Sequence, residues 1–281
     1  MSDLLMSQLA ATNMVYARFS LEYFIESMKR LGVHNIELYG CSPHFHFWDT
    51  DENPVPKLKK QFAGSGLKIV SLMPEENTYP INLAAKESQL RKQTVALYKQ
   101  FISSAAELDC PQMLLCPGRP SYDQPYWDSY SYARDSISEL VEYAEKEGIT
   151  LMYEVLNNRE SYLAANRFDY YRMVKDIDSP CFKCCVDMVH VAANGERMEQ
   201  YFQLLGDKIG HIHTVDGKPT GHLKWGDGNI DLDDNLNALR KHDYKGYIPM
   251  EMAAGRYMTD PEPHYRDNIE YLRKHFDGGE L

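Results

Sequence analysis

The sequence predicts an α/β protein, a single-domain (β/α)8 TIM barrel. Three observations support this prediction. Short apolar runs alternate with amphipathic helical segments along the chain. About eight strand–helix units fit into 281 residues, a common length for one barrel of this type. No low-complexity linker divides the chain, so we expect residues 1–281 to form one domain.

The strands are expected in short apolar runs bounded by polar loops. The first run lies near residues 5–14, and the others lie at residues 35–39, 68–73, 113–116, 149–155, 182–186, 209–215 and 247–252. Pro249 lies inside the last run. Because proline lacks the N–H group that a strand ladder uses, it counts against a strand there.

The segments between these runs have the spacing of helices with one apolar face. Three such faces are Leu21, Ile25 and Met28; Leu90, Leu97, Phe101 and Leu108; and Ile137, Leu140, Val141 and Ala144. Glycines typical of helix ends follow several segments, at Gly32, Gly66, Gly148 and Gly246. The alternative is an open α/β sheet. Its dinucleotide-binding form is disfavoured because no G-x-G-x-x-G motif follows the first run.

The composition is that of an ordinary globular protein, with 43% hydrophobic and 25% charged residues. The formal net charge of −11 repels phosphate backbones, so we expect no nucleic-acid partner. Residues 1–11 lack the features of a signal peptide, and no apolar stretch approaches the length of a membrane span. We therefore expect a cytoplasmic protein without membrane contact.

The six cysteines are expected to be free thiols, because the chain is long and shows no export signal. Cys181, Cys184 and Cys185 raise the alternative of a zinc site. We favour buried core positions for them, because they lie on an apolar run and no second cysteine pair is present.

Four of the predicted strands end in a residue able to bind a metal: Glu154, Asp187, His213 and Glu251. The carboxyl ends of barrel strands meet at one mouth, so we expect these side chains to lie together. Charged groups at buried strand ends are costly unless they are paired or bind a metal. A network of buried salt bridges is the alternative. His211 points to the same side of its strand as His213, one layer deeper, as a supporting or core residue.

Three carboxylates and one imidazole suit one divalent ion, namely Mn²⁺, Co²⁺, Mg²⁺ or Zn²⁺. The absence of a thiolate from the set argues against a site for soft metals.

With these residues assembled, the chain resembles the xylose isomerase-like barrel superfamily, which includes sugar epimerases and endonuclease IV. The resemblance is strongest over residues 149–255. Its motifs are Glu154-Val155-Leu156-Asn157 followed by Glu160, then Asp187-x-x-His190, the strand ends at His213 and Glu251, and His222-x-x-x-Gly226-Asp227-Gly228-Asn229. The first resembles the fifth-strand motif of ketose 3-epimerases, and the last resembles their loop after strand seven.

Two further stretches, residues 38–44 and 74–82, are similar to fructoselysine 3-epimerases. The chain departs from the D-tagatose and D-psicose 3-epimerases after strand seven, where Asp216-Gly217-Lys218 occupies the region of a substrate-binding arginine. An acidic residue there suits a substrate that carries a positive amine.

The resemblance implies a metal-dependent sugar epimerase that inverts C3 of a ketose or ketosamine of the fructoselysine or psicoselysine type. Glu154 and Glu251 would hold the metal and also pass the proton through an enediolate. Six residues would contact a sugar or sugar-amine substrate: Glu160, His190, Asp216, His222, Glu75 and His44. Related barrels also imply a homo-oligomer.

Three alternatives stay open. An aldose–ketose sugar isomerase would use the same site but move hydrogen between C1 and C2. An endonuclease IV-like DNA-repair enzyme would need histidines after the third and fourth strands, where this chain has Glu75 and Cys116. A non-catalytic sugar-binding protein would not need both proton-transfer carboxylates, which are present here.

Overall fold

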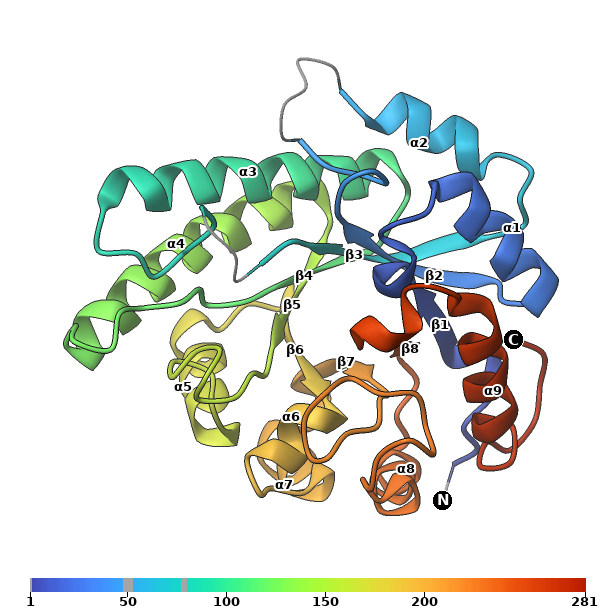
Figure 1. Ribbon diagram of the computed structural model, residues 1–281. Helices are drawn as coiled ribbons and strands as arrows, with labels where there is room; N and C mark the ends of the chain where they lie inside the picture. Colours follow the sequence, from blue (N-terminus) through green and yellow to red (C-terminus); the bar gives the residue numbers. More distant parts are fainter. Residues whose placement is uncertain (1, 48–52, 77–79) are drawn as a thin grey trace.

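The computed structural model describes residues 2–47, 53–76 and 80–281. Eight parallel strands form a nearly closed barrel with helices between them (Figure 1), in the order β7-β6-β5-β4-β3-β2-β1-β8. The strands are β1 (Leu9–Thr12), β2 (Asn35–Gly40), β3 (Lys68–Pro74), β4 (Gln112–Leu115), β5 (Thr150–Glu154), β6 (Phe182–Asp187), β7 (Ile209–His213) and β8 (Ile248–Met250). The predicted fold class is confirmed, and each strand lies within or overlaps its predicted run.

Helices surround the barrel (Figure 1), and they bury most of their predicted apolar faces against it. Leu90 is the exception, because it is half-buried and outside the core, and Leu108 packs against the core just after α3 ends. The α-helices are α1 (Leu21–Leu31), α2 (Val55–Phe62), α3 (Ser88–Glu107), α4 (Tyr126–Glu147), α5 (Arg167–Ile177), α6 (Met188–Ala193), α7 (Met198–Leu205), α8 (Leu232–Lys241) and α9 (Pro261–Leu272). Short 3-10 helices are Met6–Gln8, Met14–Tyr16, Gly206–Lys208 and Gly255–Tyr257. In the described ranges no helix combines the length and apolar character that a membrane span requires.

Local sequence explains where these helices begin and end. The Ser20 hydroxyl accepts the N–H of Tyr23 and caps the start of α1. Gly32 and Gly148 end α1 and α4 with φ near +71°, a conformation that costs little for glycine. Both glycines lie where the sequence predicts helix ends.

The barrel closes between β7 and β8 without a regular ladder in the described residues. β8 pairs with β1 through Leu9 and Ile248, Ala10 and Pro249, and Ala11 and Met250. On its other side the Thr214 N–H donates to the Pro249 carbonyl at 2.8 Å. The N–H and C=O of one strand residue point the same way, so the N–H that proline lacks would face β7, where the ladder is open. This explains why β8 tolerates Pro249.

The barrel interior holds both buried polar and buried apolar side chains. Most buried apolar side chains lie between the strands and the helices, while a small interior cluster is formed by Met73, Leu114, Met152 and Cys185. All six cysteines are free thiols, as expected. The N- and C-terminal segments lie side by side (Figure 1), where the Asp277 N–H donates to the Leu4 carbonyl.

Candidate metal centre

The structure brings together the four strand-end residues at the mouth of the barrel. Glu154, Asp187 and His213 end β5, β6 and β7, and Glu251 directly follows β8. Each offers one ligand atom, and these atoms all lie within 4.8 Å of one another. His213 Nδ1 lies 3.0 Å from Glu154 Oε1, 2.9 Å from Glu251 Oε2 and 3.8 Å from Asp187 Oδ2. All four side chains are buried.

Two carboxylate oxygens in this cluster are buried without a hydrogen-bond partner in the described part of the chain: Asp187 Oδ2 and Glu251 Oε2. The other oxygen of Asp187 caps α6 by accepting the N–H groups of Val189 and His190. Asp187 is therefore held with its free oxygen toward the cluster. Histidine nitrogens lie 2.9 Å from Glu251 Oε2 and 3.3 Å from Asp187 Oδ2, but neither oxygen accepts a hydrogen bond from them. Buried carboxylate oxygens without a hydrogen bond are costly, and one divalent cation would satisfy both. The residues present fit such an ion.

Burial and neighbouring charges shift the pKa values of the clustered carboxylates and histidines in opposite directions. Burial raises the pKa of Glu251 to about 8, although His213 and His222 pull it down. Burial also acts on Asp187, but His190 and His222 hold the pKa of that carboxyl well below its usual range. Burial disfavours charged His213, yet Cys185, Glu251 and Glu37 hold its pKa well above the usual value. Without a cation, the site thus retains protons that a metal would displace.

Glu37 lies behind His213 and was not identified from the sequence. It belongs to β2, is fully buried, and holds two imidazoles: its Oε1 accepts His213 Nε2–H at 2.9 Å and its Oε2 accepts His211 Nε2–H at 2.7 Å. Although burial opposes ionisation, the two histidines hold the pKa of Glu37 well below its usual range. A glutamate inside an apolar strand is itself a sign of a buried partner, and that sign was present at residues 35–39.

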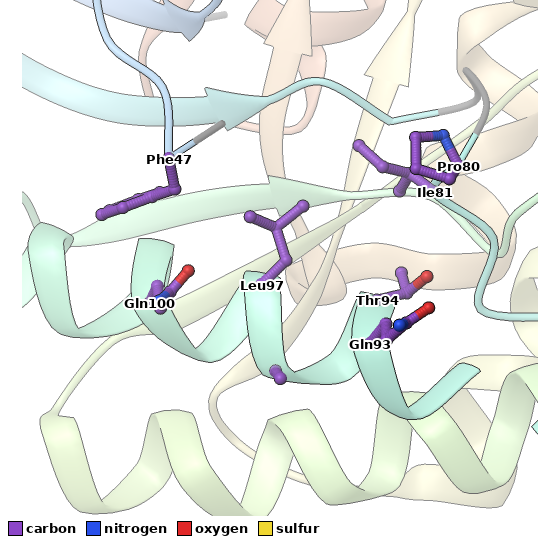
Figure 2. Close-up of a pocket in the computed structure, with 8 residues that line it drawn as sticks. Phe47, Pro80, Ile81, Gln93, Thr94, Leu97 and Gln100 are labelled. Carbon is purple, nitrogen blue, oxygen red and sulfur yellow. The ribbon is translucent and has the colours of Figure 1, made fainter. Parts of the chain in front are cut away.

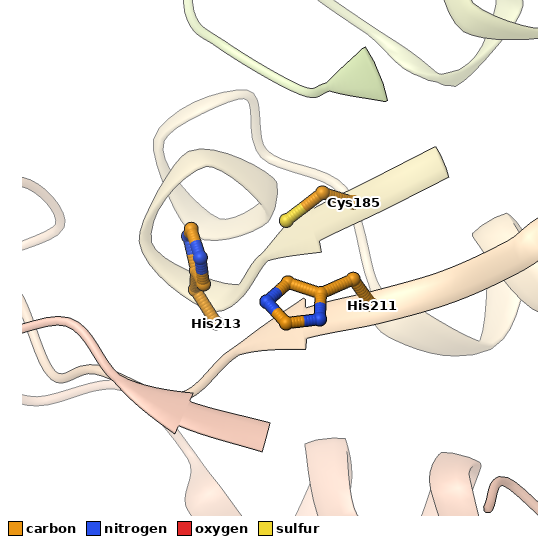
Figure 3. Close-up of side chains that lie close together, drawn as sticks. All are labelled: Cys185, His211 and His213. Carbon is orange, nitrogen blue, oxygen red and sulfur yellow. The ribbon is translucent and has the colours of Figure 1, made fainter. Parts of the chain in front are cut away.

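His211 lies one layer below His213, as expected from strand alternation. Figure 3 shows both rings on β7 next to Cys185 of β6. Cys185 points into the barrel beside these histidines.

Three of the expected substrate-binding residues line the same mouth. His190 Nε2 lies 3.3 Å from Glu160 Oε2, and the His190 ring lies 5.3 Å from that of His222. His222 Nε2 lies 3.3 Å from Asp187 Oδ2 and 3.5 Å from Glu251 Oε2. Burial lowers the pKa of His222, but Glu251 and Asp187 outweigh it and raise the value to about 10. The three side chains thus lie around the four candidate ligands.

Asp216 is not free for the amine contact expected from the sequence. Its carboxylate accepts four backbone N–H groups, which come from Gly217 (2.8 Å), Gly226 (3.1 Å), Gly228 (2.7 Å) and Ile230 (3.1 Å). These bonds use both oxygens to order the loop after β7.

His44 and Glu75 are also engaged by other parts of the chain. The His44 ring contacts the Asn13 amide at 2.7 Å and the Phe19 carbonyl at 2.9 Å, so both of its nitrogens are used. Glu75 accepts the Tyr39 hydroxyl and the N–H of Glu76. Residues 77–79 of the predicted loop lie outside the described ranges.

Glu76, the neighbour of the expected residue Glu75, lies beside the candidate metal centre. The Cys116 thiol donates to Glu76 Oε2 and lies 3.7 Å from Glu154 Oε2. Glu76 Oε1 is buried without a partner in the described residues. Burial and the charge of Glu154 raise the pKa of Glu76 well above its usual value. Sequence reasoning missed Glu76 because its strand ends at Pro74, after which alternation no longer predicts direction.

A separate groove lies on α3 (Figure 2), with a volume of about 370 Å³. It is lined mainly by Phe47, Pro80, Ile81, Thr94, Leu97 and Gln100. None of the four candidate ligands lines it, so it is separate from the candidate metal centre.

Comparison with known proteins agrees with this architecture. The family model described as xylose isomerase-like TIM barrel matches residues 25–275. The fructoselysine 3-epimerase of Shigella flexneri is 27% identical over 260 residues, covering 92% of this chain and 94% of the relative. The D-psicose 3-epimerase of Agrobacterium fabrum is 25% identical over 239 residues, covering 81% of this chain and 78% of the relative.

Among solved structures, the 3-keto-D-glucoside 4-epimerase of E. coli superposes with a TM-score of 0.81. The match covers 95% of this chain and 99% of that one, at 17% identity. At this identity the likeness speaks for the fold alone.

Proposed function

The chain belongs to the xylose isomerase-like TIM barrel family, and from that premise we propose that it is a metal-dependent sugar epimerase of the isomerase class. The proposed reaction inverts C3 of a ketose or ketosamine. The observation that carries this proposal is the convergence of Glu154, Asp187, His213 and Glu251, with two buried carboxylate oxygens among them that accept no hydrogen bond in the described residues. The epimerases among the relatives support the reaction class.

Glu154, Asp187, His213 and Glu251 would hold one Mn²⁺, Co²⁺, Mg²⁺ or Zn²⁺ ion. When bound, this ion supplies a Lewis acid that stabilises negative charge on the oxygens beside the reacting carbon.

In the proposed reaction, two carboxylates would move the proton. Glu154 and Glu251 come from different strands and flank His213 Nδ1 at 3.0 and 2.9 Å. A substrate between them would present one face of C3 to each. One glutamate takes the C3 proton and leaves an enediolate, and the other returns a proton to the opposite face. The number of protons on the pair is restored, and the configuration at C3 is inverted.

The polar groups around the mouth favour a neutral or cationic substrate. In the described part of the chain, the ion-pair partners of Glu154, Asp187, Glu251 and Glu160 are all histidines. These pairs include no lysine or arginine, the side chains that usually bind the phosphate of an anionic sugar. Glu76 Oε1 is left to accept a hydrogen bond from a substrate hydroxyl or amine.

We extend the proposal to a ketosamine of the fructoselysine type. Glu76 Oε1, which accepts no hydrogen bond in the described residues, would contact the amine of the substrate. Asp216 would not, because both of its oxygens accept backbone N–H groups. The fructoselysine 3-epimerase relative supports this choice, at 27% identity.

The test is turnover of fructoselysine, D-fructose and D-psicose by protein reloaded with Mn²⁺, followed by NMR in D₂O. We expect deuterium at C3 and formation of the C3 epimer, with fructoselysine preferred. Deuterium at C1 or C2 would show an aldose–ketose isomerase instead. Absence of exchange with every sugar would contradict the epimerase proposal.

A further inference from the structure

A hydrogen-bonded chain of side chains runs through the barrel interior below the metal centre. It begins at Gln112, whose Nε2 lies 2.7 Å from His211 Nδ1. His211 Nε2 lies 2.7 Å from Glu37, and Glu37 also reaches His213 Nε2 at 2.9 Å. All four residues are buried, and Glu37, His211 and His213 are 0% exposed. The chain joins β4, β7 and β2.

The donors and acceptors in this chain have one consistent direction. An amide nitrogen only donates, so His211 Nδ1 accepts from Gln112 and carries no proton. The proton of His211 is then on Nε2, which donates to Glu37. A carboxylate accepts only, so the remaining oxygen of Glu37 takes the Nε2–H of His213.

The direction of these hydrogen bonds determines which form the second ring nitrogen of His213, Nδ1, can take. Because the Nε2–H group of His213 donates its hydrogen bond to Glu37, the Nδ1 atom of the same ring can present a lone pair toward Glu154, Asp187 and Glu251. An imidazole nitrogen binds a cation only through a lone pair. A carboxylate behind such a ring also fixes its orientation and increases its basicity as a ligand.

We propose that Glu37, held by His211 and Gln112, is a positioning residue that keeps Nδ1 of His213 facing the metal centre and thereby sets its cation affinity. This inference rests on the metal centre of the proposed function. It assigns a role to three residues that touch neither metal nor substrate.

Glu37→Gln tests the role while it keeps side-chain volume. The introduced amide must donate to one imidazole, so His213 or His211 has to expose a lone pair at Nε2. If His213 does so, its Nδ1 carries the proton and is lost as a ligand. If His211 does so, the carboxylate that made His213 more basic is still gone. We expect the Kd for Mn²⁺, measured by calorimetry without sugar, to rise roughly 10- to 100-fold.

A second substitution should restore the order of donors and acceptors. In Glu37→Gln/Gln112→Glu, the new carboxylate accepts from His211 Nδ1, so His211 Nε2 can accept from the amide at position 37. The amide oxygen is then free for His213 Nε2–H. We expect the double variant to regain most of the lost affinity. Gln112→Glu alone retains Glu37, and its affinity should stay near that of the parent chain.

Thermal unfolding in EDTA checks that each variant is folded. If Glu37→Gln does not fold, ¹⁵N-histidine NMR of the Zn²⁺-loaded parent chain gives the answer, with the His213 signals assigned by comparison with His213→Gln. A proton on Nε2 of His213 supports the inference, and a proton on Nδ1 overturns it.

The outcomes separate this inference from the proposed function. A parent chain that does not bind Mn²⁺ would overturn both. A binding parent with equal affinity in Glu37→Gln would overturn only the role of Glu37. A weakened single variant without recovery in the double variant would overturn the ordered chain from Gln112.

Discussion

At the scale of single residues, the candidate metal centre consists of buried carboxylates that lie next to a buried histidine. Glu154 and Glu251 flank His213, and Asp187 is fixed by the start of α6. Asp187 is restrained by two backbone N–H groups, as suits a fixed ligand, whereas Glu154 and Glu251 contact His213 and are the residues that we propose to face the substrate.

Replacing either glutamate of the proposed proton-transfer pair should slow the reaction strongly. Glu154→Gln and Glu251→Gln each remove a base, and we expect turnover at saturating Mn²⁺ to fall about 10²- to 10⁴-fold. Glu139→Gln is a matched control on the outer face of α4, where the carboxylate is 58% exposed and pairs with Lys99. Its turnover should equal that of the parent. Normal turnover in either of the first two variants would exclude the two-glutamate scheme.

The raised pKa of Glu251 predicts how metal binding depends on pH. In the metal-free protein this pKa rises from 4.5 to about 8, so the folded state favours the protonated form. The resulting stabilisation is complete below pH 4.5 and is lost as the pH rises through about 8. The His222 contribution is complete below pH 6.5 and is lost as the pH rises through about 10.

A metal must displace these protons, so its affinity should increase between pH 6 and pH 8. The increase in Tm that Mn²⁺ produces over EDTA should therefore be larger at pH 8 than at pH 6. Differential scanning calorimetry measures both Tm values. An equal increase at the two pH values would show that Glu251 and His222 do not release protons to the ion.

Glu76 predicts a difference between substrates. Glu76→Gln keeps a hydrogen-bond acceptor but loses a carboxyl group that could give up its proton and become negative beside a bound ammonium group. We expect KM for fructoselysine to rise about tenfold, equivalent to about 1.4 kcal/mol, while KM for D-psicose changes little. Steady-state kinetics with both sugars test this. A similar change for both sugars would remove Glu76 as the group that selects an amine.

At the scale of elements, the loop after β7 is organised by one side chain. Asp216 accepts four backbone N–H groups, and its own backbone pairs with Leu223, next to His222. Gly228 approaches Asp216 so closely that an added Cβ would lie 2.1 Å from its Oδ1. The loop that carries His222 therefore depends on a buried carboxylate and on a residue without a side chain.

Asp216→Ala should destabilise the chain by about 1–3 kcal/mol, because it leaves buried N–H groups without an acceptor. Substrate KM should rise as well, since His222 loses its support. Asp267→Ala is the control, because it removes a 56% exposed partner of Lys224 in the same region. Its effect should stay within about 1 kcal/mol. Chemical denaturation and kinetics measure both, and unchanged values for Asp216→Ala would contradict this role.

Much of the architecture could be predicted from the sequence because strand runs and helix faces are local patterns. Pro249 counts against a strand in the last predicted run, yet β8 forms there because the ladder with β7 is open at this residue. Loop contacts are not local. His44 is engaged by Asn13 and Phe19, which lie at least 25 positions away, and no periodicity shows this.

At the scale of the whole molecule, the barrel turns separated strand ends into one centre. Glu154 and Glu251 lie nearly a hundred positions apart, yet both reach His213. The four candidate ligands were predictable because barrel topology converts strand ends into neighbours. Glu37 was not, because its partners His211 and His213 come from the other side of the barrel.

Crystals grown with Mn²⁺ test the central claim most directly, through an anomalous difference map recorded at the manganese edge. We predict one strong peak per chain, about 2.0–2.3 Å from atoms of Glu154, Asp187, His213 and Glu251, with His213 bound through Nδ1. A map without a peak between these four residues, or with manganese bound elsewhere, would contradict the account.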